Sequence, residues 1–338
     1  MSADTSPAAT PVMDTVEVDV LVVGAGPVGL FAAYYSGFRG LSVGVVDSLP
    51  ELGGQITAMY PEKDILDVAG FPVVKGKDLV AGLVEQAASA DPTYLLGRTA
   101  QTLTSIEDEG VVRVGLDDGT TVVAKAVIIT AGIGKFTPRP LPAAAEWTGD
   151  EVAFFVPSFT QYAGKDVVIV GGGDSAFDWA VALEPIAASV TLVHRREAFR
   201  AHQATVDKVL ASSVTVLTNA NVVRLLGDPG LEALEIEDVK TKTTTVVKAQ
   251  AVVAALGFVA DLGPIQSWGL EVEKRHIVVD STTRTNLPRV FAAGDITEYP
   301  GKVRLIAVGF GEAATAVNNA AVAINPAAHL FPGHSSEG

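Results

Sequence analysis

Residues 19–38 read DVLVVGAGPVGLFAAYYSGF, and this stretch decides the fold of the first half of the chain. The apolar, β-branched run at 19–23 has the length of a strand, and a helical pattern follows as far as Phe38. Between them Gly24, Gly26 and Gly29 form the pattern G-x-G-x-x-G. This spacing permits a tight turn, a close backbone approach to a pyrophosphate and close helix packing, so it predicts a dinucleotide site at the helix start.

A second apolar run, 41–46, ends at Asp47, about 20 residues after the first glycine. A carboxylate at this place accepts hydrogen bonds from the ribose hydroxyls of an adenosine. Pro27 stands within the same glycine pattern and is a further candidate residue of this nucleotide site. Glycine also marks ordinary strand-to-helix connections, which is the structural alternative for the turn. The strand, the helix and Asp47 together favour the nucleotide site.

The same device recurs at 166–176, where DVVIV runs into GGGDSA and a helical pattern through Leu183. One chain therefore contains two predicted dinucleotide sites. The candidate residues of the second turn are Gly171, Gly173, Asp174, Ser175 and Ala176.

The two sites differ in the residues that follow their second strand. After the run 190–193, His194, Arg195 and Arg196 stand where the first site has its carboxylate, and Arg200 follows. A guanidinium binds a 2′-phosphate through two parallel hydrogen bonds, whereas a carboxylate repels it. The alternative is a solvated basic surface patch. The position at the strand tip favours NADP as the second nucleotide.

Composition limits the other function classes. At about 100 to 200 residues per domain, 338 residues predict two domains. The net charge of −15 makes nucleic acid an unfavourable partner, and the absence of cysteine excludes disulfides, thiolate metal sites and dithiol chemistry. Residues 20–38 are uncharged, but their glycines and proline favour a strand, turn and helix over a membrane span. Residues 1–13 lack signal-peptide features, so we expect a disordered tail and a cytoplasmic protein without a bound metal.

Near the C-terminus, VFAAGD at 290–295 predicts a short buried strand, and a helical pattern runs from 311 to 323. Here the sequence resembles the flavoprotein reductases with two dinucleotide-binding domains. The resemblance implies that the first nucleotide is FAD, that Asp295 hydrogen-bonds its ribitol, and that the backbone N–H of Ile296 reaches the flavin pyrimidine. A helix N-terminus there would favour the negative charge of a reduced flavin.

The short second domain is similar to that of low-molecular-weight thioredoxin reductases. Those enzymes carry Cys-x-x-Cys before the second fingerprint, whereas residues 155–162 read FVPSFTQY here. The sequence therefore resembles the thioredoxin-reductase-like ferredoxin–NADP reductases over almost its whole length after residue 16. The segments that carry this resemblance are 51–72 (ELGGQITAMYPEKDILDVAGFP), 171–179 (GGGDSAFDW), the HRR cluster, 301–319 (GKVRLIAVGFGEAATAVNN) and the tail Pro332-Gly333-His334-Ser335.

The same resemblance assigns the flavin surroundings. It implies that Tyr60 stacks on one face of the flavin. It also implies that the tail covers the other face through His334, with Ser335 beside it, in either the same chain or the partner subunit. It also implies that Gly53, Gly54 and Gln55 bring backbone against the ring system. From the residues alone, Tyr60 would be an ordinary half-buried aromatic and His334 a mobile tail residue.

The expected fold is α/β, with two doubly wound domains. The FAD-binding domain would comprise 14–131 and 262–338, and the NADP(H)-binding domain would be inserted at 135–258. The resemblance implies a homodimer in which NADPH gives a hydride to flavin N5 and electrons leave singly to ferredoxin or flavodoxin. We expect the NADP domain to rotate about 132–135 and 257–261 while the tail moves aside.

Two other functions fit the same motifs. The first is an NADPH-dependent flavin or quinone reductase (a diaphorase), and the second is a non-catalytic FAD redox sensor, which would not need the arginines of the second site. An acidic carrier would need a basic docking patch on this acidic chain. The candidates for that patch are Lys75, Lys77, Lys302 and Arg304.

Overall fold

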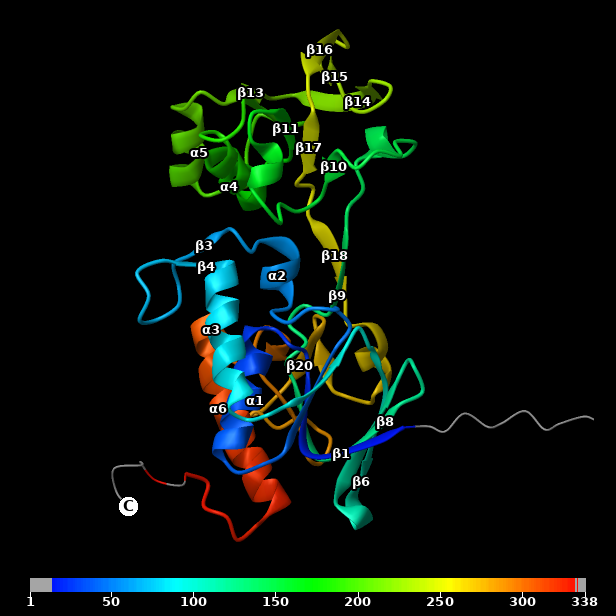
Figure 1. Ribbon diagram of the computed structural model, residues 1–338, viewed down its shortest axis with the longest axis vertical. Coiled ribbons are helices and arrows are strands. Elements are labelled where there is room, and N and C mark those ends of the chain that lie inside the picture. The colour runs from blue at the N-terminus through cyan, green and yellow to red at the C-terminus, as the bar shows by residue number, and fades with distance from the viewer. Residues whose placement is uncertain (1–13, 332, 334–338) are drawn as a thin grey trace, which may run out of the picture.

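The computed structural model describes residues 14–331 and 333. The predicted disordered tail at 1–13 and the candidates His334 and Ser335 lie outside this range. Figure 1 shows two α/β bodies, one above the other, joined by a narrow ribbon of two strands. No helix in the described ranges is long and apolar enough to span a membrane.

The lower body in Figure 1 is built on a seven-stranded sheet whose strands come from both ends of the sequence. Its order is β5-β2-β1-β8-β7-β6, and β21 pairs with the end of β8. Strands β5, β2, β1, β8 and β21 are parallel, while β6 and β7 are antiparallel neighbours. The strands are β1 (Thr15–Val23), β2 (Val43–Asp47), β5 (Thr93–Leu96), β6 (Ala100–Ile106), β7 (Val111–Leu116), β8 (Thr121–Ile129) and β21 (Val290–Ala292).

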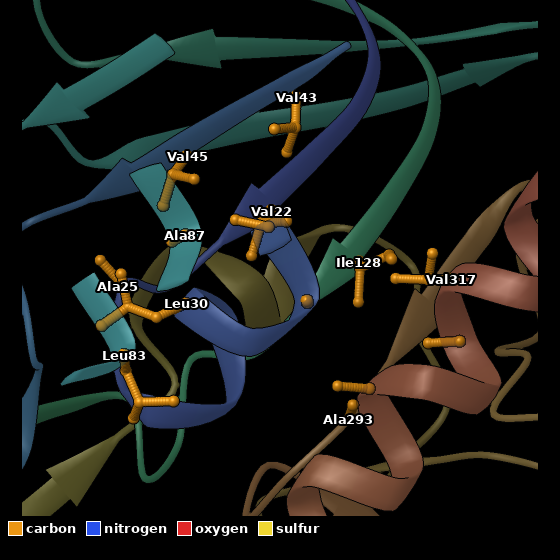
Figure 2. Packing of buried hydrophobic residues seen from close by; sticks show 14 of the residues in the cluster. Val22, Ala25, Leu30, Val43, Val45, Leu83, Ala87, Ile128, Ala293 and Val317 are labelled. Carbon is orange, nitrogen blue, oxygen red and sulfur yellow. The ribbon is translucent and has the colours of Figure 1, made fainter. Parts of the chain in front are cut away.

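Side chains along β1 alternate between the two faces of the sheet, and each face contacts a separate core layer. Val20 and Val22 face three helices, whereas Leu21 and Val23 face a second layer formed by β6, β7 and residues 262–279. The helices are α1 (Pro27–Phe38), α3 (Gly76–Ala88) and α6 (Ile306–Ile324). Figure 2 shows the helical layer, where Leu83 lies on the side of Ala25 and Leu30, and Val317 lies beside Ile128. Apolar contact on both faces buries β1 at the centre of the domain.

The upper body repeats this plan on a smaller scale. Its five parallel strands have the order β10-β17-β11-β12-β13. Helices cover one face, and an antiparallel three-stranded sheet covers the other. The elements are β10 (Val152–Ala153), β11 (Asp166–Val170), α4 (Asp174–Leu183), β12 (Ser189–Val193), α5 (Gln203–Leu210), β13 (Thr215–Leu217), β14 (Ala220–Leu226), β15 (Ala233–Asp238), β16 (Thr244–Lys248) and β17 (Ala251–Ala254).

Strands β9 (Lys135–Pro138) and β18 (Phe258–Asp261) form the antiparallel ribbon that joins the two bodies. The remaining short elements belong to the lower body. They are α2 (Gln55–Met59), β3 (Asp64–Ile65), β4 (Val74–Lys75), β19 (Val272–Glu273), β20 (His276–Val278) and β22 (Thr297–Glu298). Short 3₁₀ turns occur at Glu107–Glu109, Pro142–Ala144, Thr160–Tyr162 and Gly263–Ser267. The α/β fold class with two Rossmann-like domains is confirmed.

The helix predicted at 311–323 begins earlier, at Ile306. Gly309 and Gly311 weaken the helical pattern in the sequence. A Cβ on Gly309 would lie 2.5 Å from a methyl carbon of Val28, so close packing against α1 requires glycine there. Tertiary packing therefore extends the helix through a segment of low local propensity.

Candidate nucleotide-binding sites

The first glycine turn lies between β1 and α1, with each glycine held by a different constraint. Gly24 has a φ of +113°, which favours glycine, and a Cβ on Gly29 would lie only 1.8 Å from the carbonyl oxygen of Gly24. A Cβ on Gly26 would meet nothing within 4 Å. The turn thus leaves open space at its middle glycine, beside the N-terminus of α1, and this shape fits a pyrophosphate.

Asp47 ends β2 beside this turn. Its carboxylate oxygens accept hydrogen bonds from the backbone N–H groups of Ala25 (2.6 Å) and Leu49 (2.8 Å). Burial raises the pKa of Asp47, and the two backbone hydrogen bonds oppose that shift. The side chain therefore ties the strand end to the glycine turn and leaves further lone pairs for ribose hydroxyls.

The loop before α2 packs against the same turn. Gly53 and Gly54 both have positive φ, and the Gly53 N–H donates to the Ala25 carbonyl at 2.9 Å. A Cβ on Gly54 would lie 2.9 Å from the Cα of Gly26. The amide of Gln55 reaches Gly132, where a Cβ would lie 2.7 Å from its nitrogen. At Gly53 and Gly54 the loop therefore brings backbone to the edge of the first turn, whereas Gln55 reaches Gly132 with its side chain.

Tyr60, directly after α2, contacts buried residues of both bodies. Burial raises the pKa of Tyr60, and the charges of Asp295 and Asp67 raise it further, so the hydroxyl stays protonated at neutral pH. The effect of Asp295 on this pKa places the two sequence candidates within electrostatic reach of each other. Burial likewise raises the pKa of the Asp295 carboxyl, although Lys302 and Arg304 oppose the shift. Ile296, the next residue, is fully buried.

The second turn, between β11 and α4, has the same outline. A Cβ on Gly171 would lie 2.4 Å from the carbonyl oxygen of Ala255, whereas a Cβ on Gly173 would meet nothing within 4 Å. The side chain of Asp174 accepts a hydrogen bond from the His202 N–H at 2.9 Å. Ser175 is exposed and Ala176 is buried at the start of α4. The second turn also leaves free space at its third residue.

His194 lies over this second turn. A Cβ on Gly172 would come within 2.6 Å of three atoms of the imidazole, and the ring Nε2 lies 3.2 Å from the Ala198 carbonyl oxygen. Burial lowers the pKa of His194, and the charges of Arg195, Arg196 and Arg200 lower it further, so the ring is mostly neutral at pH 7. In the structure His194 packs on the turn, and the three arginines carry the positive charge.

Arg195, Arg196 and Arg200 are exposed around the loop after β12. The backbone N–H of Arg200 donates to the Gly172 carbonyl at 2.8 Å, which ties the loop to the turn. Over the described part of the chain, no carboxylate forms an ion pair with any of the three arginines. Their guanidinium groups therefore remain available for an anion.

Two contacts join the segment around Tyr60 to the upper body. Lys63 forms an ion pair of 2.7 Å with Asp178 on α4, and the ammonium of Lys75 lies 5.9 Å from the centre of the Phe159 ring. Figure 1 shows α2, β3 and β4 directly below the upper body. The two bodies thus meet on the side that carries Tyr60.

The four candidate cations for a docking patch all have carboxylate partners in the structure. Lys302 is buried, with a side chain only 1% exposed, and it pairs with Glu312. Lys75, Lys77 and Arg304 pair with Asp64, Glu62 and Glu298, respectively. The sequence named these residues only as candidates, because a sequence alone does not show whether such cations lie together. They do not form an unpaired basic patch.

Sequence reasoning also missed two features of the first site. Thr130, after β8, donates its hydroxyl to the Gly24 carbonyl at 2.8 Å and so fixes the turn. Glu312 on α6 accepts a hydrogen bond from the Gly294 N–H at 2.6 Å, directly before Asp295. Thr130 could have been noticed because it ends a β-branched strand. Glu312 stands among helical residues and gives no local signal.

Comparison with known proteins shows what the chain is similar to. The family described as pyridine nucleotide-disulphide oxidoreductase matches residues 18–322. A ferredoxin–NADP reductase from Nocardioides sp. is 72% identical over 330 residues, covering 97% of this chain and 99% of the relative. Another from Salinispora arenicola is 63% identical, with coverage of 95% and 99%.

Solved structures share the fold. The thioredoxin reductase of T. acidophilum has a TM-score of 0.74 at 26% identity, covering 90% of this chain and 98% of that one. The thioredoxin reductase of Lactococcus lactis has a TM-score of 0.73 at 22% identity, covering 91% and 99%. The present chain contains no cysteine, so it cannot carry out the dithiol chemistry of a thioredoxin reductase. It belongs to the pyridine nucleotide-disulphide oxidoreductase family and, within it, to the thioredoxin-reductase-like group whose members are named ferredoxin–NADP reductase.

Proposed function

We propose that this chain is an FAD-dependent ferredoxin–NADP reductase, which exchanges reducing equivalents between NADP(H) and ferredoxin or flavodoxin. The observation that carries the proposal is the pair of glycine turns with opposite charges beside them. Asp47 stands at the first, and the unpaired Arg195 and Arg196 stand at the second. Identity of 72% to a protein named ferredoxin–NADP reductase supports the same activity.

In this proposal the first site holds FAD. Gly24, Gly26, Pro27 and Gly29 form the pyrophosphate cradle, and Asp47 binds the adenosine ribose. Asp295 holds the ribitol and the N–H of Ile296 the pyrimidine, while Gln55 lies at the edge of the ring system. Tyr60 stacks on one face, and His334 and Ser335 cover the other. A bound FAD supplies the conversion between two-electron hydride chemistry and single-electron transfer.

The second site holds NADP(H) in the same proposal. Gly171, Gly173, Asp174, Ser175 and Ala176 line the pyrophosphate at the start of α4. Arg195, Arg196 and Arg200 bind the 2′-phosphate, since each guanidinium offers several donors to an anion. His194 acts as a neutral cover on Gly172, which holds the loop in place for the arginines.

The domain boundaries remain part of the proposal. The FAD-binding domain comprises 14–131 and 262–338, and the NADP(H)-binding domain comprises 135–258. The ribbon of β9 and β18 contains the connections about which the NADP domain would turn. We also propose a homodimer and a cytoplasmic location, on the strength of the family resemblance. Sedimentation velocity of the FAD-loaded protein tests the first, with a single species of twice the chain mass expected.

The activity is tested by turnover with alternative acceptors. NADPH is supplied to the FAD-loaded protein, and rates are compared for a purified ferredoxin, a flavodoxin and a quinone. We expect kcat/KM to be highest for one of the two carrier proteins. A higher value for the quinone would favour a diaphorase, and no bleaching of the flavin absorbance by NADPH would favour a non-catalytic sensor. Either result would contradict the proposal.

A further inference from the structure

A buried ion pair lies behind Asp295, and the nucleotide contacts proposed above do not include either of its residues. Lys302 and Glu312 approach to 2.5 Å, and their side chains are 1% and 8% exposed. Removing two ions from water is expensive, and an apolar pair of the same volume is often at least as stabilising. Overall stability is therefore a weak reason for placing these two charges here.

Both members of the pair form hydrogen bonds with the backbone of one residue, Gly294. Glu312 accepts a hydrogen bond from the Gly294 N–H at 2.6 Å, and the Lys302 ammonium donates to the Gly294 carbonyl oxygen at 2.9 Å. The Tyr299 hydroxyl donates to the second oxygen of Glu312 at 2.5 Å. Burial and the Glu312 carboxylate raise the pKa of Tyr299 to about 12, so this hydroxyl remains a donor. Both peptide groups of Gly294 are thereby fixed by charged side chains.

Gly294 is also where the two segments of the first site meet. It has a φ of +84°, and a Cβ on it would lie 3.2 Å from Val28, which stands between Gly26 and Gly29 at the start of α1. Gly309 of α6 completes the contact, because a Cβ there would lie 2.5 Å from Val28 and 3.4 Å from the Cα of Gly294. The orientation of Gly294 therefore sets where Asp295 and Ile296 stand relative to the turn.

The pair also acts on the local charge. Lys302 lowers the pKa of Asp295 and Glu312 raises it, which places both charges within electrostatic reach of that carboxyl. In a site of low dielectric constant, opposite charges at this separation nearly cancel at a distance, whereas either charge alone would not. Arg304 also lowers the pKa of Asp295, but its side chain is 36% exposed and pairs with Glu298, so solvent screens its charge more than that of the buried Lys302.

We propose that Lys302 and Glu312 are positioning residues for the flavin end of the first site: they hold the Gly294 peptides and keep the charge behind Asp295 neutral. This rests on the proposed binding of FAD at that site. Breaking the pair from either side would misplace Asp295 and Ile296. It would also leave one uncompensated charge, of a sign that depends on which partner is removed.

The sign of that charge gives the test. In Lys302→Met the remaining carboxylate opposes the negative charge of a reduced flavin, so the midpoint potential of the bound FAD should fall. In Glu312→Gln the remaining ammonium favours that charge, so the potential should rise. The double variant should return close to the wild-type potential. Both single variants should bind FAD more than about tenfold more weakly, measured by flavin fluorescence.

Arg304→Met serves as the matched control, because it removes a nearby cation that solvent screens, and its potential shift should be smaller than that of Lys302→Met. Lys302→Arg keeps the charge and should keep FAD and its potential even if Lys302→Met does not fold. Shifts of equal sign in the two single variants, unchanged potentials, or a shifted potential in Lys302→Arg would overturn the inference. A wild-type protein that binds no FAD would instead overturn the proposed function.

Discussion

The two nucleotide turns of this molecule occupy equivalent places in two similar sheets, and their differences lie in the residues beside them. Val23 of β1 pairs with Val46 of β2, and Val170 of β11 pairs with Val193 of β12. Asp47 and His194 therefore stand at the same position, one residue after the last pair that β2 forms with β1 and β12 forms with β11. At the first turn a carboxylate binds the turn amide of Ala25, and at the second an imidazole packs on Gly172.

This comparison indicates that a few side chains can give two sites with the same backbone plan different nucleotide preferences. Burial raises the pKa of Asp47 and lowers that of His194, so desolvation disfavours the charged form of both. The selective charges of the second site come from Arg195 and Arg196, which lie beyond the strand end and remain exposed. The residue at the strand end shapes each glycine turn. In our proposal, the loop that follows β12 selects the 2′-phosphate of the nucleotide at the second site.

The largest expected effect comes from the last position of the G-x-G-x-x-G pattern, which is Gly29 in the first turn and Ala176 in the second. Gly29→Ala places a Cβ 1.8 Å from the Gly24 carbonyl oxygen, whereas the second turn already has Ala176 at this position. We expect a loss of bound FAD and a loss of about 1 to 3 kcal/mol in the free energy of unfolding. Flavin absorbance of the purified protein and urea titration measure the two quantities.

Gly82→Ala is the control for this substitution. Gly82 lies in α3, and a Cβ there meets nothing within 4 Å, so the variant should keep FAD and gain up to about 1 kcal/mol. A Gly29→Ala protein with full FAD content and wild-type stability would show that the first turn is not as tightly packed as described.

The next effect concerns coenzyme choice at the second turn. Replacing Arg195 and Arg196 with alanine removes charged hydrogen bonds to a 2′-phosphate, and kcat/KM for NADPH should fall about 100-fold. The value for NADH should change by less than about threefold, because NADH lacks that phosphate. Steady-state rates with both coenzymes measure the preference. Arg224→Ala, an exposed arginine paired with Glu235 in the same domain, should leave it unchanged.

An intermediate effect is expected at the first strand tip. Asp47→Asn keeps one acceptor oxygen for the turn but loses the charge and the second acceptor. The dissociation constant for FAD should rise about tenfold, measured by fluorescence titration of the apoprotein. Asp117→Asn is a suitable control, since Asp117 also accepts a backbone hydrogen bond, from Thr99, but lies on the exposed surface. Equal affinities of wild type and Asp47→Asn would remove Asp47 from the site.

The smallest expected effect is the pH dependence of stability that His194 contributes at the end of β12. Because the folded-state pKa of His194 is lowered, the unfolded chain binds more protons near pH 6.5, and stability should fall as the pH drops through that value. His194→Gln should lose this part of the slope while matching wild type near pH 8. Thermal unfolding between pH 8 and pH 5 measures it. Parallel curves for the two proteins would contradict the neutral, packed histidine.

Local patterns predicted the elements that surround both turns. The helices expected to end at Phe38 and Leu183 end there, as α1 and α4. In both cases strand periodicity, a glycine turn and a helical pattern agree over a short stretch. Such agreement is local in the sequence, so it does not depend on the rest of the fold.

The errors arose where distant residues decide the outcome. The helix expected from Gly311 begins at Ile306 because Gly309 packs on Val28, far away in the sequence. Lys302 was a candidate for the docking patch, but in the structure it is buried and bonds to Glu312 and the Gly294 carbonyl. A single lysine carries no sequence signal for such a partner, because the pairing exists only once α6 has packed on β8 and β21.

The central claim, two sites of different preference in one chain, is tested most directly by rapid mixing of the FAD-loaded protein with NADPH or NADH in the absence of oxygen. The account predicts that NADPH bleaches the flavin absorbance much faster than NADH does, and that the Arg195 and Arg196 double variant loses this difference. Equal bleaching rates for the two coenzymes in the wild-type protein would contradict it.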